Sequence, residues 1–428
     1  MSSAVTHGGE PGVDELLELV IADPPRAAAA ASSRLATGER LTAREVARLH
    51  WVLGRAEREA GRLDSAKAHL EDALGIAGTI GDVEALIGIH SSLAFTVARQ
   101  GDLDGALKLI ELAELMAGPV ERARLLAQRG TVLYLRGELS GGAELVAAAC
   151  EEMKRTGDTV HEARHRTNLG MALSDLGRYG AARRHLSRAV ALAEQHGLDI
   201  LVAHAKASLA YTSTLQGDLP AALREFAEAE HWHRKVDPTM DMPRLQTDHA
   251  RALADAALLD DAEGMLANAL AVLRAQGQYT ELPACLLRAA EIGVARGNLV
   301  GAVEAADEAT RLFAQQGRDR WVALAANLAL RARVRLEGAS LATVAELDRG
   351  CEQLDEYGWH AEALRTRLLV AMLHAESDTL PPRPRRTPSR SAAGRSPWSV
   401  LVLARDALAW ATRMSRPCCS AIATARLR

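Results

Sequence analysis

Aromatic residues are scarce in this chain. Phe, Trp and Tyr together make up 3% of the 428 residues, whereas Ala, Leu, Arg and Glu dominate the composition. Strands favour aromatic and β-branched side chains, and helices favour the four abundant residue types. The composition therefore argues against a sheet-rich protein and predicts an all-α fold, in a chain long enough to bury a large core.

Cysteine is also rare and follows no pattern. The five Cys are scattered, and no CxxC pair occurs among them. A disulfide framework or a cysteine-rich zinc site requires paired or regularly spaced cysteines. Their absence excludes a small disulfide-stapled secreted domain, and we expect a cytoplasmic protein.

Long apolar runs and enzyme motifs are missing as well. Asp14, Glu15 and Glu18 interrupt the one stretch near the N-terminus that resembles a signal peptide. No uninterrupted apolar run approaches the length that spans a bilayer. No phosphate-binding loop, dinucleotide-binding glycine motif or recognisable nucleophile is present. We therefore expect no membrane segment, no catalytic residues and no cofactor.

What the chain has instead is a repeat, anchored on a small residue that recurs mostly every forty positions. Large apolar residues follow each anchor by two positions, and small residues lie five and twelve positions after it and seven before it. The anchors are Gly61, Gly101, Gly137, Gly177, Gly217, Ala257 and Gly297. A fixed period in this range is typical of stacked repeat arrays.

Each repeat reads as two helices joined by a tight turn. Ala182, Leu186 and Ala189 lie four and three residues apart, so they share one face of a helix. Gly177, at the turn before them, adopts positive φ at no steric cost. One such hairpin cannot bury its apolar face alone, so the array is stable only when its repeats stack.

These spacings resemble the tetratricopeptide repeat (TPR) family over residues 47–313, with Leu169-Gly170 in a first helix, Gly177 at the turn and Ala182 with Ala189 in the second helix. The resemblance implies a right-handed superhelix (α-solenoid) of about eight helix-turn-helix repeats with N-terminal capping helices. The unit is longer than is usual for the family. It is similar to the arrays of actinobacterial regulators and of CHAT-domain, caspase-like proteins.

The pattern divides the chain into four parts. Residues 1–12 are expected to be disordered, residues 13–40 form a degenerate capping half-repeat, and residues 41–378 form the TPR array, with seven clear units, one weak unit and one truncated unit. Residues 379–428 are a basic, Arg- and Pro-rich tail. Three interpretations of this tail stay open: a disordered basic tail, a segment read out of frame, or a peripheral membrane segment at residues 399–414.

Charge is distributed unevenly along the chain. Of 51 basic and 55 acidic residues, ten and one respectively lie in residues 379–428, so the repeat body carries a net charge of −13. An acidic body is unsuited to a polyanion, and we expect no nucleic acid to bind through the repeats.

One motif suggests metal chemistry. His161 and His165 flank Glu162 in an HExxH pattern, which in zinc hydrolases supplies two imidazole ligands and a general base. The segment also fits the first helix of the fourth repeat, and we expect a solvated helix face rather than a metal site. A zinc hydrolase at these residues is the remote alternative.

In the TPR family the first helices of the repeats line a concave groove that binds peptides, and the resemblance carries this role to one set of residues. We expect the groove to hold Arg48, Trp51, Arg55, Arg99, Arg124, Tyr134, Arg164, Met171, His204, Tyr211, Arg244 and Arg251. Arginine recurs in this set although the body is acidic, and its guanidinium group makes paired hydrogen bonds to carboxylates.

The function expected from these features is a non-enzymatic scaffold that binds a protein or peptide partner, with an acidic segment favoured. An alternative is the truncated sensory or regulatory half of a multidomain CHAT-type peptidase or transcription regulator. The C-terminal end of the array has no capping pattern, which predicts self-association there.

Overall fold

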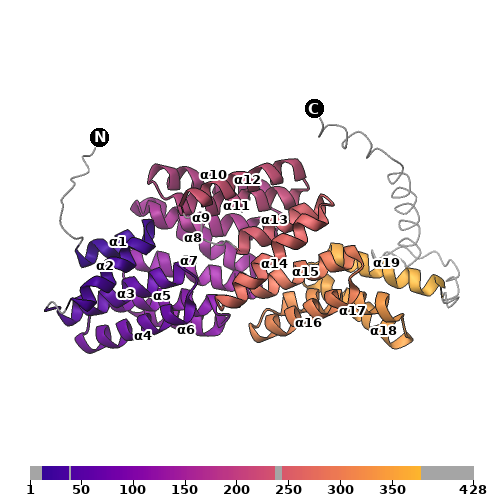
Figure 1. Ribbon diagram of the computed structural model, residues 1–428, viewed down its shortest axis with the longest axis horizontal. Coiled ribbons are helices and arrows are strands. Elements are labelled where there is room, and N and C mark those ends of the chain that lie inside the picture. Colours follow the sequence, from indigo (N-terminus) through magenta and orange to yellow (C-terminus); the bar gives the residue numbers. More distant parts are fainter. Residues whose placement is uncertain (1–11, 38–39, 237–242, 377–428) are drawn as a thin grey trace, which may run out of the picture.

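The protein is an array of antiparallel helices. The computed structural model describes residues 12–37, 40–236 and 243–376, and within them it has nineteen α-helices and no strand (Figure 1). The helices are α1 (Val13–Ala22), α2 (Pro24–Ala36), α3 (Ala43–Glu59), α4 (Leu63–Ile80), α5 (Val83–Arg99), α6 (Leu103–Met116), α7 (Pro119–Arg136), α8 (Leu139–Thr156), α9 (Thr159–Asp175), α10 (Tyr179–Gln195), α11 (Asp199–Gln216), α12 (Leu219–Val236), α13 (Pro243–Asp255), α14 (Leu259–Ala275), α15 (Leu282–Arg296), α16 (Leu299–Gln315), α17 (Asp319–Glu337), α18 (Leu341–Glu356) and α19 (His360–Glu376).

The expected turn at each anchor is confirmed. Six of the seven anchors are glycines with positive φ, and the seventh, Ala257, adopts a φ of 62°. An alanine in this left-handed region is strained, because its Cβ approaches the neighbouring backbone. A side-chain cap starts the first full repeat: the Thr42 hydroxyl accepts a hydrogen bond from the Glu45 backbone N–H at the start of α3.

The recurring small residues lie where helices approach closely. The alanines at the slots five, seven and twelve positions from the anchors are all buried, among them Ala94, Ala182 and Ala269. A Cβ on Gly54 would lie 2.6 Å from the Leu70 Cγ atom, and one on Gly130 would lie 2.6 Å from the Gly142 carbonyl oxygen. The repeat pattern thus records helix–helix contacts within each hairpin.

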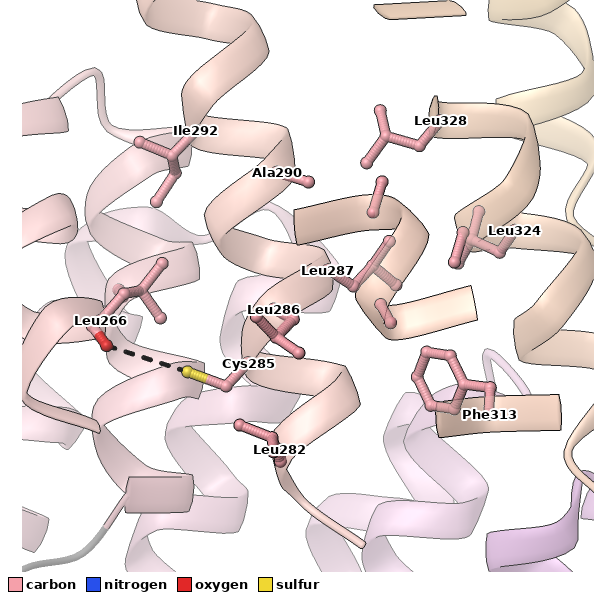
Figure 2. Packing of buried hydrophobic residues seen from close by; sticks show 14 of the residues in the cluster. Leu266, Leu282, Cys285, Leu286, Leu287, Ala290, Ile292, Phe313, Leu324 and Leu328 are labelled. Atoms are coloured by element: carbon pink, nitrogen blue, oxygen red, sulfur yellow. Dashed lines mark hydrogen bonds between the residues drawn. The ribbon is translucent and has the colours of Figure 1, made fainter. Parts of the chain in front are cut away.

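Large apolar residues fill the space between the hairpins. Figure 2 shows one such region, where Leu282, Leu286 and Leu287 of α15 lie between Leu266 of α14 and Phe313 of α16. This cluster extends from α13 to α19, so each hairpin buries its apolar face against its neighbours.

The first and second helices of the repeats occupy different sides of the array. From α1 to α19, each odd-numbered helix contacts the next odd-numbered helix, and contacts between successive even-numbered helices are far fewer. A stack curves toward the side on which its helices are closest together. The odd-numbered helices α3 to α17 therefore form the concave side, which we call the inner surface.

The curvature is strong enough to bring distant repeats into contact. In Figure 1 the chain runs from α1–α6 at the left, through α9–α12 at the top, and returns toward the lower right at α16–α18, so the array curves back. The Thr280 backbone N–H, in the turn between α14 and α15, donates to the Arg99 carbonyl at the end of α5, 3.2 Å away. The Thr280 hydroxyl also donates to the Ala98 carbonyl. The sequence did not predict this contact.

The two ends of the array differ. Helices α1 and α2 pack on α3 through Leu16, Val20 and Ala27, as expected of a capping half-repeat. At the other end, Leu364 and Met372 of α19 are exposed. Self-association through this end stays a prediction. The expectations for residues 1–11 and 379–428 lie outside the described residues. None of the helices in the described ranges is long and apolar enough to cross a membrane.

Candidate partner-binding surface

All twelve residues expected to line the groove lie on odd-numbered helices, from α3 to α13. The structure separates them into two regions of the inner surface. The first region surrounds Arg55, Arg99 and Arg164, and the second surrounds Tyr134, Tyr211 and Arg244.

The first region is a group of four guanidinium groups around one carboxylate. We call Arg55, Arg58, Arg99 and Arg164 the arginine cluster; they belong to α3, α5 and α9, that is, to the first, second and fourth repeats. These residues come from repeats that are separated in the sequence, so their electrostatic interactions show that the curvature of the superhelix brings them close together. The carboxylate of Glu59 interacts electrostatically with Arg58, Arg164 and Arg99, in that order of strength.

Glu59 is the carboxylate that these arginines share. Its side chain accepts a hydrogen bond from the Arg58 Nη2 atom at 2.8 Å. Burial alone would raise the pKa of Glu59, but the positive charges of Arg58, Arg164 and Arg99 outweigh that effect and lower the pKa to about 2. Two further carboxylates act at the edge of the cluster, Glu18 on Arg55 and Glu281 on Arg99, so three carboxylates face four guanidinium groups and one positive charge remains in excess.

The pKa values of the arginines reflect both their burial and the charges around them. Burial, followed by the positive charges of Arg58 and Arg164, lowers the pKa of Arg55 to about 9. Burial also lowers the pKa of Arg99 and of Arg164, although Glu59 opposes the shift in both. All of these groups stay charged at neutral pH, and repulsion by neighbouring guanidinium groups is the leading charge interaction only at Arg55.

Three members of the cluster are held by protein atoms. Arg55 donates to the Leu17 carbonyl at 3.1 Å, Arg99 donates to the Arg58 carbonyl at 2.8 Å, and the Arg58 guanidinium lies over the Phe95 ring. Among the described residues no hydrogen bond or ion pair joins the half-buried Arg164 guanidinium. Its donors are therefore available to a ligand.

The second region is neutralised internally. The hydroxyl groups of Tyr134 and Tyr211 both donate to the Asp175 carboxylate, each at 2.6 Å. Burial and the charge of Asp175 raise the pKa of both tyrosines well above its usual range, so they stay protonated donors. Two repeats on either side of α9 are tied to the end of α9 by this bridge.

Charges of both signs surround this bridge. Burial raises the pKa of Asp248 to about 6; Arg244 opposes this shift and Glu281 adds to it. Arg251 lies 3.9 Å from Asp255, and Arg288 pairs with Glu291. The Arg244 guanidinium contacts the sulfur of the buried Met171. Each cation here has a nearby carboxylate or soft acceptor, in contrast to the arginine cluster.

Three expected groove residues contact other parts of the protein. Arg48 pairs with Asp14 and with Glu84, Arg124 donates to Asp158 at 2.6 Å, and the Trp51 indole N–H donates to the Ser92 hydroxyl at 2.9 Å. Their polar groups are engaged in joining one repeat to the next. His204 lies on α11 at the inner surface, where the surrounding helices desolvate its ring and lower its pKa to about 4, so it is neutral at pH 7.

The sequence reasoning missed the carboxylates of the inner surface. Glu59 and Asp175 lie four residues after Arg55 and Met171, on the same helix faces. That spacing could have been used to predict that both carboxylates lie on the inner surface. The contribution of Glu281, which acts on Arg99 from the turn between α14 and α15, depends on the superhelical curvature and had no sequence signal.

The expectation of a solvated helix face at the HExxH segment was wrong, because Glu162 and His165 are buried in the packing of α9 against its neighbours. Glu162 is buried and accepts a hydrogen bond from Arg166 at 2.7 Å, and His161 Nδ1 lies 2.9 Å from an Asp158 carboxylate oxygen. His165 is buried, and burial followed by His161 and Arg164 lowers its pKa to about 3. The Glu162 carboxylate is bound to Arg166 and so is not free to act as a base.

The stacked hairpins and the concave inner surface define the class of the protein, an α-solenoid. The tetratricopeptide repeat family matches residues 164–196, which extend from α9 into α10. No curated protein matches the chain significantly. The proposed kinship with CHAT-domain proteins stays a prediction.

Solved structures are similar to this chain at low sequence identity. A chain of the APC/C hetero-tetramer Cut9–Hcn1 is 11% identical, with a TM-score of 0.53 over 86% of this chain and 76% of that chain. A Rap protein complexed with Competence and Sporulation Factor is 14% identical, with a TM-score of 0.44 over 86% and 92%. The quorum sensor NprR from B. thuringiensis is 12% identical, with a TM-score of 0.46 over 86% and 93%.

Proposed function

We propose that this protein is a non-enzymatic scaffold that binds an acidic segment of a partner protein on its inner surface. The observation that supports this proposal best is the charge imbalance of the arginine cluster, in which four guanidinium groups surround the Glu59 carboxylate, with Glu18 and Glu281 at its edge. Burial lowers the pKa of Arg55 most, and repulsion by Arg58 and Arg164 lowers it further; a carboxylate from a ligand would relieve that repulsion.

The stereochemistry of the cluster suits a carboxylate ligand. A guanidinium group offers paired donors in a plane, which match the two oxygens of Asp or Glu side chains. Arg164 has donors that no described residue uses. His204, which is close enough to Glu59 and Arg164 for their charges to affect its pKa, adds a neutral imidazole that can donate one more hydrogen bond.

The second region indicates which way a bound partner segment runs along the inner surface. A bound chain that extends from the arginine cluster along the inner surface reaches Arg244, which is exposed, and the carboxyl group of Asp248. We expect acidic residues of the partner at the arginine cluster and polar or mixed-charge residues at the second region. Electrostatic complementarity of this kind sets the register and the association rate of a complex.

A fluorescence-anisotropy titration tests the proposal. The probe is a labelled peptide rich in Asp and Glu, compared with a peptide of the same length in which Gln and Asn replace the acids. We expect the acidic peptide to bind at least about tenfold more tightly, since each charge-assisted hydrogen bond contributes ~1.5 to 3 kcal/mol. Arg164→Glu should abolish most of that difference.

The matched control is Arg349→Glu. Arg349 is exposed on α18, an outer helix, and the substitution changes the net charge by the same amount. If Arg349→Glu weakens the acidic peptide as much as Arg164→Glu does, the attraction is a property of net charge and not of the arginine cluster. Equal affinity for the acidic and the amide peptide would also contradict the proposal.

A further inference from the structure

Two histidines and one aspartate meet on the hairpin of the first repeat. His50 lies on α3, and His69 and Asp72 lie three residues apart on α4, so all three face the seam between the two helices. The Nδ1 atoms of His50 and His69 are 3.2 Å apart, and His50 Nδ1 is 3.7 Å from an Asp72 carboxylate oxygen. One ligand atom of each residue lies within 4.8 Å of the others.

We propose that His50, His69 and Asp72 bind a divalent transition-metal ion, with Zn²⁺ as the first choice. Two nitrogens that coordinate the same tetrahedral zinc ion at ~2.0–2.1 Å are about 3.3 Å apart, close to the observed separation of the two imidazole nitrogens. The Asp72 carboxylate oxygen, 3.7 Å from His50 Nδ1, has to move toward the two nitrogens to reach the same ion. Two imidazoles and a carboxylate suit Zn²⁺, Co²⁺ or Ni²⁺, and not Mg²⁺ or Ca²⁺.

The site is accessible to an ion from solution. His50 and His69 are half-buried and Asp72 is exposed. Glu57 is also near His69, but its carboxylate is bound by Arg62, whose Nη2 atom lies 2.9 Å from one carboxylate oxygen. The three protein ligands leave one position of a tetrahedral ion open to water.

Comparison among the repeats shows that this arrangement is particular to the first repeat. The equivalent residues of the fourth repeat, eleven positions before and eight positions after the anchor, are Arg166 and His185. There the Arg166 guanidinium lies 2.8 Å from His185 Nδ1 and pairs with Glu162 and Glu151. A guanidinium at that position donates to the imidazole and leaves no lone pair for a metal. None of the other repeats carries two imidazoles at these positions.

The proposal is independent of the partner-binding function, because the site lies on the hairpin seam of α3 and α4 and does not involve the arginine cluster. A bound ion would join α3 to α4 by coordinate bonds. It would therefore stabilise the repeat that receives the N-terminal cap.

Calorimetric titration of the metal-free full chain with Zn²⁺ tests the proposal. We expect one equivalent to bind through this site, and both His69→Ala and the conservative Asp72→Asn to weaken that binding, the first by at least about thirtyfold and the second by about tenfold. Asp72 is exposed, so Asp72→Asn keeps the test decisive even where a histidine variant folds poorly. The matched control is His185→Ala, which removes the equivalent imidazole of the fourth repeat and should leave the affinity unchanged.

Titration with Co²⁺ identifies the ligands directly. We expect visible absorption bands of a nitrogen- and oxygen-ligated Co²⁺ ion without the intense near-ultraviolet band of a thiolate ligand, and we expect His69→Ala to remove the visible bands. A thiolate band, or binding that His165→Ala removes and His69→Ala does not, would place the ion elsewhere and overturn the proposal. So would the absence of Zn²⁺ binding by the unmodified chain.

Discussion

The two regions of the inner surface differ in the balance of their positive and negative side chains. In the second region Asp175 receives hydrogen bonds from Tyr134 and Tyr211, and the surrounding arginines face carboxylates. In the first region four arginines share Glu59. Both regions lie on the same set of odd-numbered helices and are built by the same repeat. The repeat therefore specifies a scaffold, and the residues at its inner positions decide whether a stretch of that scaffold is internally satisfied or open to a ligand.

The two regions differ in what stabilises their charges. A neutralised network is stable by itself and contributes to the rigidity of the superhelix. A cluster of like charges is stabilised by water and counterions, and a ligand carboxylate can replace them at a gain. Four predictions test this difference between the two regions, in order of decreasing effect on the free energy of unfolding.

The largest effect is expected from the second region. Asp175→Ala removes the acceptor of two tyrosine hydroxyl groups and should lower the free energy of unfolding by about 3 kcal/mol, since hydrogen bonds to charged groups are worth ~1.5 to 3 kcal/mol each. Urea unfolding followed by circular dichroism measures the change. Asp104→Ala, which removes an exposed carboxylate on α6, should change stability by less than about 0.5 kcal/mol. A small effect of Asp175→Ala would mean that the bridge is not structural.

Glu59→Gln should cost about 2 kcal/mol, because it removes the carboxylate that interacts with Arg58, Arg164 and Arg99. The comparison predicts a further difference: sulfate or citrate at tens of millimolar should restore much of the lost stability in this variant. Asp175→Ala should show no such rescue, because its region has no excess positive charge. Thermal unfolding with and without citrate, at matched ionic strength, measures both effects. Equal rescue of the two variants would contradict the assignment of the excess charge to the arginine cluster.

Acid should destabilise the protein through His165, which lies beside the arginine cluster. Its pKa is about 3 in the folded protein and about 6.5 in an unfolded chain, so the unfolded state takes up a proton first. The stability that neutral His165 provides is complete above pH 6.5 and is lost as the pH falls below it. We expect a loss of about 1.5 kcal/mol between pH 8 and pH 5.5. His165→Gln should reduce this slope, whereas His360→Gln, at an exposed imidazole, should preserve it. An unchanged slope in His165→Gln would refute this prediction.

The smallest effect is expected at Asp248 in the second region. Burial raises its pKa to about 6, with Glu281 adding to the shift and Arg244, Arg288 and Arg251 opposing it. The folded protein therefore holds a proton that the unfolded chain has lost between about pH 4 and pH 6, and stability falls as the pH rises through this window. Asp248→Asn should gain at most about 1 kcal/mol at pH 7.5 and nothing at pH 4, as measured by urea unfolding at the two pH values. A gain that is equal at both pH values would show that the carboxyl charge is not its cause.

Much of the architecture was predictable from the sequence for a local reason. The turn at Gly177, the helix that begins at Thr42 and the burial of Ala182 and Ala189 depend on residues within one repeat or its neighbour. Spacings of three and four residues define a helix face, and glycine at the anchor allows the turn. The candidate site was predictable only in part: Arg55 and Arg164 were expected on one surface, but the roles of Glu59 and Asp175 were not recognised.

By itself, then, the sequence determined the helices, the turns, the repeat and the side of each helix that faces inward. The tertiary structure alone decided which inward residues meet. The interaction of Arg164 with Glu59 and the hydrogen bonds from Thr280 to α5 join repeats that are far apart in the chain. A small rotation between neighbouring hairpins, accumulated over several repeats, sets these distances, and that rotation arises from the packing of whole side-chain layers and not from any one motif. The same holds for His50 and His69, whose nitrogens face each other only because α3 and α4 pack at this particular separation.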